Sequence, residues 1–139
     1  MKAFRDAIEA RDFDGIGDLL ADHVVFNSPV AFKPYEGRPI VHAILRGVSR
    51  VFEDFRYVDQ IGSAETGGGD SSALVFETRI GDVTVHGCDF LHIDNTGLID
   101  AFTVMVRPLS AARALSDAMA AQFDQILTEA TAEMPEGLR

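Results

Sequence analysis

The sequence lacks tryptophan, has a single cysteine and contains no long apolar run. One cysteine, Cys88, cannot form an intramolecular disulfide, and such sparse usage is typical of a reducing compartment. No segment approaches the roughly 20 apolar residues that a membrane-spanning helix needs. The first residues lead into a charged amphipathic segment and not into the apolar core of a signal peptide. These absences predict a cytoplasmic protein.

Basic side chains are also scarce, since 12 Lys and Arg stand against 22 Asp and Glu and leave a net charge of −10. An acidic surface repels phosphate backbones and anionic lipids. We therefore expect neither a nucleic acid nor a membrane as a partner. The length of 139 residues suits one domain that buries one core.

Hydrophobic periodicity divides the chain into helical and extended parts. Apolar residues at helical spacing predict helices over residues 4–11, 13–20 and 37–52, and again from Leu109 to about residue 128. A short β-branched strand is expected over residues 24–26 and a loop over residues 30–36. From residue 55 the period changes to two, which predicts strands over residues 55–64, 72–80, 83–93 and 98–107.

This order of elements predicts an α+β fold, with the amino-terminal helices on the concave face of a curled antiparallel sheet and one helix after it. We expect one domain over residues 1–128. Residues 129–139 have little to bury and are expected to form a frayed tail. Helices against a curled sheet enclose an apolar cone, and such cavities are common binding sites for small molecules.

One carboxyl group falls where an apolar side chain is expected. Alternate residues of a strand share a face, and on one face of the strand over 83–93 these are Val83, Val85, Gly87, Asp89, Leu91 and Ile93. A buried acid is costly unless it is hydrogen-bonded, paired or protonated. Asp89 is therefore either a protonated donor to a ligand carbonyl or hydroxyl, or a structural acid bonded to a neighbouring group. Its apolar surroundings favour the functional interpretation.

Three segments, together with the order of elements, resemble the nuclear transport factor 2-like superfamily. They are Ala21-Asp-His-Val-Val-Phe-Asn-Ser-Pro-Val30, Glu36-Gly-Arg38 and Asp89-Phe-Leu-His-Ile-Asp-Asn-Thr-Gly97. That superfamily includes ketosteroid isomerases, SnoaL-like polyketide cyclases and limonene epoxide hydrolases. The resemblance covers roughly residues 3–110 and implies a cone-shaped, cystatin-like fold. It does not imply one activity, because this fold hosts many unrelated functions.

Position by position, the resemblance implies an incomplete set of catalytic residues. Asp89 falls where the isomerases keep a protonated acid that donates to an oxyanion. Phe4 replaces the Tyr of that oxyanion hole, Ser28 replaces the Asp general base, and Leu45 replaces a supporting Tyr. Cyclases and hydrolases carry an acid where this chain has Val104, and the Arg of the hydrolase Arg-x-Asp pair is missing. We therefore do not expect steroid isomerisation or epoxide hydrolysis.

The resemblance and the buried acid together predict a SnoaL-like domain with an apolar pocket for a small apolar or carbonyl-bearing molecule. The residues expected to line it with Asp89 are Phe4, Ser28, Leu45, Phe76, Val85, Phe102, Val104 and Val106. Ser28 has an equal alternative as a turn residue before Pro29. One alternative function is an isomerase, cyclase or dehydratase with Asp89 as general acid or oxyanion donor. Another is a dimerisation module without catalytic activity.

We expect no cofactor and no metal, because the four histidines lack ligand spacing. His42 and Arg46 are expected on a solvated helix face. The outward strand face carries apolar residues at Cys88, Phe90 and Met105, which predicts a two-fold homodimer. Coverage of this face by the carboxy-terminal helix is the alternative.

Overall fold

The computed structural model describes residues 2–62 and 70–138. Its elements in chain order are α1 (Lys2–Glu9), α2 (Phe13–Ile16), η1 (Gly17–Leu19), β1 (Leu20–Asn27), β2 (Tyr35–Glu36), α3 (Arg38–Val51), β3 (Glu53–Ile61), β4 (Asp70–Ile80), β5 (Val83–Ile93), β6 (Ile99–Arg107), α4 (Leu109–Glu133) and η2 (Glu136–Leu138). The last residues of the strand expected over 55–64 lie outside the described part of the chain.

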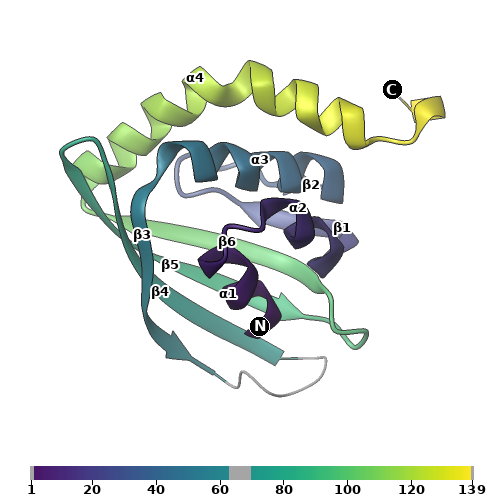
Figure 1. Cartoon of the computed structure of the whole chain (residues 1–139), viewed down its shortest axis with the longest axis horizontal. Helices are drawn as coiled ribbons and strands as arrows, with labels where there is room; N and C mark the ends of the chain where they lie inside the picture. Colours follow the sequence, from purple (N-terminus) through teal and green to yellow (C-terminus); the bar gives the residue numbers. More distant parts are fainter. Residues whose placement is uncertain (1, 63–69, 139) are drawn as a thin grey trace.

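The strands form one curled sheet in the order β2-β1-β6-β5-β4-β3. Strand β1 runs parallel to β6, whereas the pairs from β6 to β3 are antiparallel. Figure 1 shows α1, α2 and α3 on the concave side of this sheet, and α4 along the outer side of α3. This arrangement confirms the expected α+β fold. The sheet does not close, because β2 and β3 lie at its two ends.

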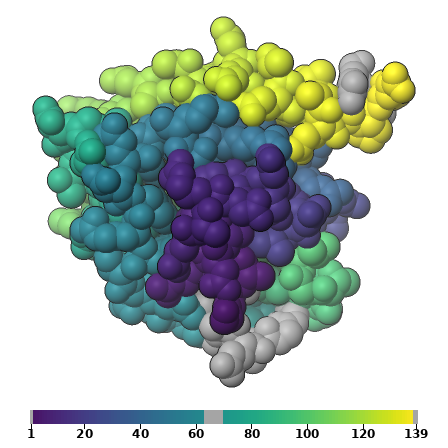
Figure 2. Space-filling model, viewed as in Figure 1, coloured from purple at the N-terminus to yellow at the C-terminus, as the bar shows by residue number. Residues whose placement is uncertain are grey.

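Helix α1 packs between α3 and the edge strand β3, as the space-filling view also shows (Figure 2). Arg5 of α1 donates to the side chain of Gln60 in β3 at 2.9 Å. On its inner side, the ring of Phe4 lies 5.3 Å from that of Phe102 in β6. The helix therefore closes one side of the cone.

The second helix changes its geometry along its length. The α-helix ends at Ile16 and the 3₁₀ turn η1 continues to Leu19, so the helix expected over 13–20 is confirmed except at Leu20, where β1 begins. Gly17 lowers helix propensity in this segment, and Leu20 pairs with Ile99 of β6. Pairing with a distant strand therefore ends the helical segment at Leu19.

The first strand is longer than expected, and a second short one accompanies it. Strand β1 extends the strand expected over 24–26 in both directions. Strand β2 lies within the segment expected to be a loop and pairs with β1 through Tyr35 and Glu36. Both differences arise from pairing at the sheet edge, which a local pattern does not report.

Helix α4 continues to Glu133, beyond the boundary expected at residue 128. Residues 129–133, which were expected to belong to a frayed tail, are therefore helical. Ala130 is buried in the core. Near this residue α4 lies so close to α3 that a Cβ on Gly47 would be 2.7 Å from Ile126 Cδ1. Among the described residues, no helix combines the length and apolarity needed to cross a bilayer.

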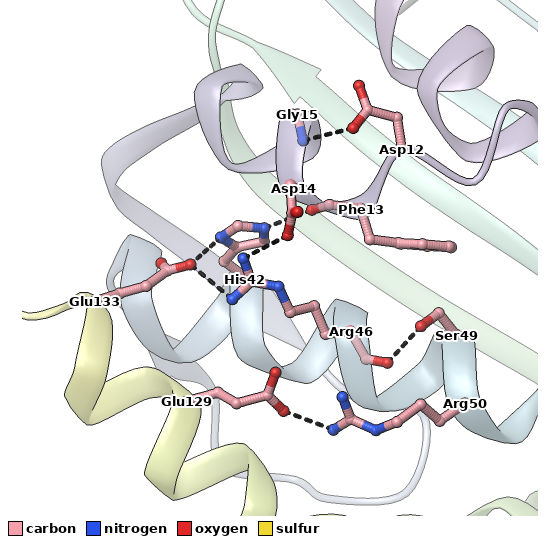
Figure 3. Close-up of polar contacts among 10 residues, drawn as sticks. All are labelled: Asp12, Phe13, Asp14, Gly15, His42, Arg46, Ser49, Arg50, Glu129 and Glu133. Carbon is pink, nitrogen blue, oxygen red and sulfur yellow. Dashed lines mark hydrogen bonds and ion pairs between the residues drawn. The ribbon is translucent and has the colours of Figure 1, made fainter.

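A group of polar contacts holds the end of α4 against α2 and α3 (Figure 3). His42 is only 4% exposed, so the expected solvated face is wrong for this residue. Its Nε2 lies 2.6 Å from the Phe13 carbonyl oxygen, and its Nδ1 lies 2.5 Å from Glu133 Oε1. Arg46 also pairs with Glu133 and with Asp14, at 2.9 Å each. These contacts explain why α4 stays helical as far as Glu133.

Candidate functional site

An apolar cavity of about 180 Å³ lies between the concave face of the sheet and the helices. The residues expected at the site that line this cavity are Phe4, Leu45, Phe76, Asp89, Phe102 and Val104. Rings that the sequence pattern did not assign to the site complete its walls, namely Phe13, Phe26, Phe52, Phe55 and Tyr57. The interior is therefore largely aromatic, with Asp89 as its buried acid.

The carboxyl group of Asp89 is held on the inward face of β5. Alternate residues of this strand are buried, which confirms the expected alternation, and Asp89 itself is 6% exposed. Burial among apolar side chains disfavours the charged form and raises the pKa of Asp89 to about 7, from an ordinary value of 3.8. A hydrogen bond from Tyr57 opposes this change. Near neutral pH the carboxyl group is thus available both as an acid and as its conjugate base.

Tyr57 of β3 is the hydrogen-bond partner of Asp89 within the described residues. Its Oη donates to Asp89 Oδ2 at 3.0 Å. Burial, followed by the nearby charge of Asp89, raises the pKa of Tyr57 well above its ordinary value, so the phenol stays a donor. The Phe55 ring packs edge-on at 5.0 Å, and the Arg5 guanidinium lies 5.7 Å from the Tyr57 ring centroid.

Sequence reasoning missed Tyr57, although one signal was present. Phe55 and Tyr57 share a face of a strand at a spacing of two, and Tyr57 pairs with Phe76 across the sheet. The resemblance instead directed attention to Phe4, on a helix, as the position of the oxyanion-hole Tyr. In this structure the phenol beside the acid comes from an edge strand.

Gly87 allows an aromatic ring to lie beside Asp89. A Cβ at this position would be 2.3 Å from Phe76 Cζ, so the Phe76 ring lies directly over the glycine. Val85 and Val106 pack with Phe76 in a neighbouring apolar cluster and do not line the cavity. The Phe76 ring, which packs with both valines, lines the cavity in their place.

Ser28 does not line the Asp89 cavity either. Its Oγ accepts a hydrogen bond from the backbone N–H of Val30 at 3.1 Å, which is the geometry of a turn residue. Its neighbour Pro29 reaches the cavity wall instead. Ser28 is therefore a turn residue, which was the alternative to a place in the pocket lining.

Charged side chains lie at one edge of the cavity. Glu9 of α1 pairs with Arg5 at 2.6 Å. Arg11 lies over the Phe13 ring at 5.5 Å and 3.4 Å from the carbonyl oxygen of Ser49. Within residues 2–62 and 70–138, no group of three His, Cys, Asp or Glu side chains is placed to hold a metal ion. The site therefore has an apolar interior, a hydrogen-bonding group at Asp89 and charges at one edge.

Comparison with known proteins identifies similar domains. The family model described as a SnoaL-like domain matches residues 1–102. A steroid delta-isomerase from Pseudomonas aeruginosa is 40% identical, with a TM-score of 0.82 over 91% of this chain and 90% of that one. A protein with a cystatin-like fold from Silicibacter pomeroyi DSS-3 is 35% identical, with a TM-score of 0.75 over 85% of this chain and 82% of that one. No curated protein matches the chain.

Replacing Asp89 by Asn is expected to change how stability depends on pH. Below about pH 4 the acid is protonated in both folded and unfolded chains. Between pH 4 and pH 7 only the unfolded chain releases the proton, so this group lowers the free energy of unfolding as pH rises. Above pH 7 the loss is complete. Since one pKa unit corresponds to about 1.4 kcal/mol, Asp89→Asn should gain up to about 4 kcal/mol over the wild type across this range.

Urea unfolding at pH 4, 5.5, 7 and 8 measures this difference. Asp117→Asn is the matched control, because Asp117 is exposed on α4. Its stability relative to the wild type should change little with pH. A difference between Asp89→Asn and the wild type that stays constant from pH 4 to pH 8 would contradict the assignment of a protonated, buried acid.

Proposed function

The chain belongs to the SnoaL-like domain family and is related to ketosteroid isomerases; on this premise we propose that the Asp89 cavity binds a small, apolar, carbonyl-bearing molecule. The observation that carries the proposal is the Asp89–Tyr57 pair, with Oη and Oδ2 3.0 Å apart, at the wall of an apolar cavity. Apolar walls with a small number of hydrogen-bonding groups are the usual composition of a small-molecule site.

The protonated carboxyl group supplies the hydrogen bond that a carbonyl oxygen accepts. Tyr57 donates to Oδ2 and so orients the group, leaving the proton of Asp89 for the ligand. In surroundings with little water such a bond is stronger than in solution. The aromatic walls bind the carbon skeleton of the ligand by burial. An apolar cavity of about 150 Å³ takes up benzene, so the cavity of about 180 Å³ is suited to a single ring.

Isomerisation of such a carbonyl compound is a second candidate, favoured by the 40% identity to the Pseudomonas aeruginosa steroid delta-isomerase. Shifting a proton next to a carbonyl needs an acid for the oxygen and a base for the carbon. Asp89 would serve as the acid or oxyanion donor. Among the residues that the structure describes, Glu9 is the other carboxylate at the cavity, and Arg5 holds it at 2.6 Å. Glu9 would have to release Arg5 to act as the base.

We infer that the convex face of the sheet pairs with a second copy of the chain. Phe90 and Met105 on this face are 42% and 59% exposed, and Ile61 is exposed beside them. Helix α4 packs on α3, on the opposite side of the sheet (Figure 1). Exposed apolar patches of this kind mark interaction surfaces. A dimer whose cavity binds nothing would instead favour the dimerisation module.

Binding of cyclohexanone tests the first proposal. Because the neutral form of Asp89 is the donor, the affinity should fall about tenfold per pH unit above pH 7. In Asp89→Asn the side-chain amide still donates but does not titrate, so its affinity should not change between pH 6 and pH 9. NMR titration of both proteins measures the dissociation constants. A wild-type affinity that does not depend on pH, or an Asp89→Asn affinity that changes with pH as the wild-type affinity does, would contradict the proposal.

Conversion of cyclohex-3-en-1-one, a single-ring β,γ-unsaturated ketone that fits the cavity of about 180 Å³, tests the second candidate, with the absorbance of the conjugated enone as the readout. If the chain is an isomerase, Asp89→Asn should lower the rate by about 100-fold or more, the usual contribution of an acid–base group. Glu9→Gln should do the same if Glu9 is the base. No conversion by the wild type rejects this candidate and leaves the binding proposal intact.

Sedimentation velocity tests the dimer. The wild type should sediment as a dimer, and Phe90→Glu should give a monomer, because a charge cannot be buried unpaired at an apolar interface. Phe32→Glu is the matched control, since Phe32 is 103% exposed on the loop between β1 and β2, away from the sheet face. A monomeric wild type, or dissociation by the control as well, would count against this face as the interface.

A further inference from the structure

A second cavity of about 210 Å³ lies between α3, α4 and the loop that follows β1. Its walls include Ile44 of α3 and Met119 and Phe123 of α4. Among the residues that the structure describes, none of those that line it carries a charge. Its polar lining residues are Ser28, Tyr35 and Ser116, and Ser28 Oγ already accepts the Val30 N–H. The rest of the lining is apolar, so the cavity offers a mainly apolar environment.

The two cavities share one wall. Phe26, Pro29, Val48 and Leu115 line both the Asp89 cavity and the second cavity. Each of these residues contacts both spaces, so the wall between the two cavities is one side chain thick. Leu115 comes from α4 and Val48 from α3, so the side chains of two packed helices form part of this wall.

We propose that the two cavities form one elongated ligand site, in which the second cavity takes an unbranched apolar tail of the molecule bound at Asp89. This inference rests on the proposed function, which places the carbonyl end at Asp89. It adds that the ligand is a cyclic carbonyl compound with an alkyl substituent. Each methylene of the tail gains by leaving water, whereas a charged tail would be buried without a partner.

The second cavity does not result from loose docking of α4. The helix touches α3 closely at Gly47 and Ile126, and its end is held by Glu133 through His42 and Arg46. Protein interiors are normally close-packed. A void beside so tightly fixed a contact is therefore space that the surrounding side chains leave open, and Met119 at its wall adapts easily to the shape of an occupant.

Helix α4 accordingly sets the length of ligand that the site accepts. It covers Leu109–Glu133 and lies beyond the residues 1–102 that the family model matches. Ser116 and Ala120 of this helix line the second cavity and do not line the Asp89 cavity. Both are exposed positions, so larger side chains there fill the second cavity without disturbing the core.

A series of 4-alkylcyclohexanones, from methyl to pentyl, tests the proposal by NMR titration at pH 6. For the wild type, affinity should rise about fourfold with each methylene, as expected for burial of a CH₂ group. In Ala120→Leu the rise should be lost, while cyclohexanone itself binds as in the wild type. Ala121→Leu makes the same chemical change at the next, exposed residue, which lines neither cavity, and should keep the rise. Ser116→Leu provides a second filling variant.

The outcomes separate this proposal from the one on which it rests. A chain-length dependence lost in Ala120→Leu and Ser116→Leu but kept in Ala121→Leu supports the elongated site. Affinity that does not change along the series in the wild type, or a dependence that persists in both filling variants, overturns it. The dependence of cyclohexanone binding on pH and on Asp89 reports only on the Asp89 cavity, so the two proposals fail in different measurements.

Discussion

The hydrogen bond between Tyr57 and Asp89 is the interaction on which the interior of this domain depends. A carboxyl group in an apolar cone is costly when charged, and the protein limits that cost with a phenol donor 3.0 Å away and by retaining the proton to about pH 7. The surrounding rings exclude water and thereby strengthen both effects. Gly87 lets Phe76 lie against the sheet beside the acid. The same burial that makes the charged form of this acid costly keeps the group protonated below about pH 7.

Helix α4 gives the cone its outer layer. It is joined to α3 by apolar contact at Gly47, by the ion pair of Glu133 with Arg46 and by the contact of Glu133 with His42. Fixed at this end, it passes over the wall that separates the two cavities, where it contributes Leu115. A helix held in this way forms a fixed outer wall, with Leu115 lining both cavities.

Much of the fold could be predicted from the sequence, because period-two alternation from residue 55 and helical spacing before it are local signals. Asp89 was found in the same way, as an acid on the buried face of β5. Tyr57 was not, since its role depends on the distance between β3 and β5 across a curled sheet. His42 was placed wrongly, because the carboxylate that it contacts lies in a polar segment that was expected to fray.

The sequence by itself determined the order of elements, the alternation that buries Asp89 and the apolar character of the cone. These follow from the chemistry of neighbouring residues and the geometry of single strands and helices. Only the tertiary structure decided which donor meets the acid, that Phe76 separates Val85 and Val106 from the cavity, and that α4 encloses a second space. Such features depend on the curvature of the sheet and on helix packing, where side chains distant in the chain come within a few ångströms of one another.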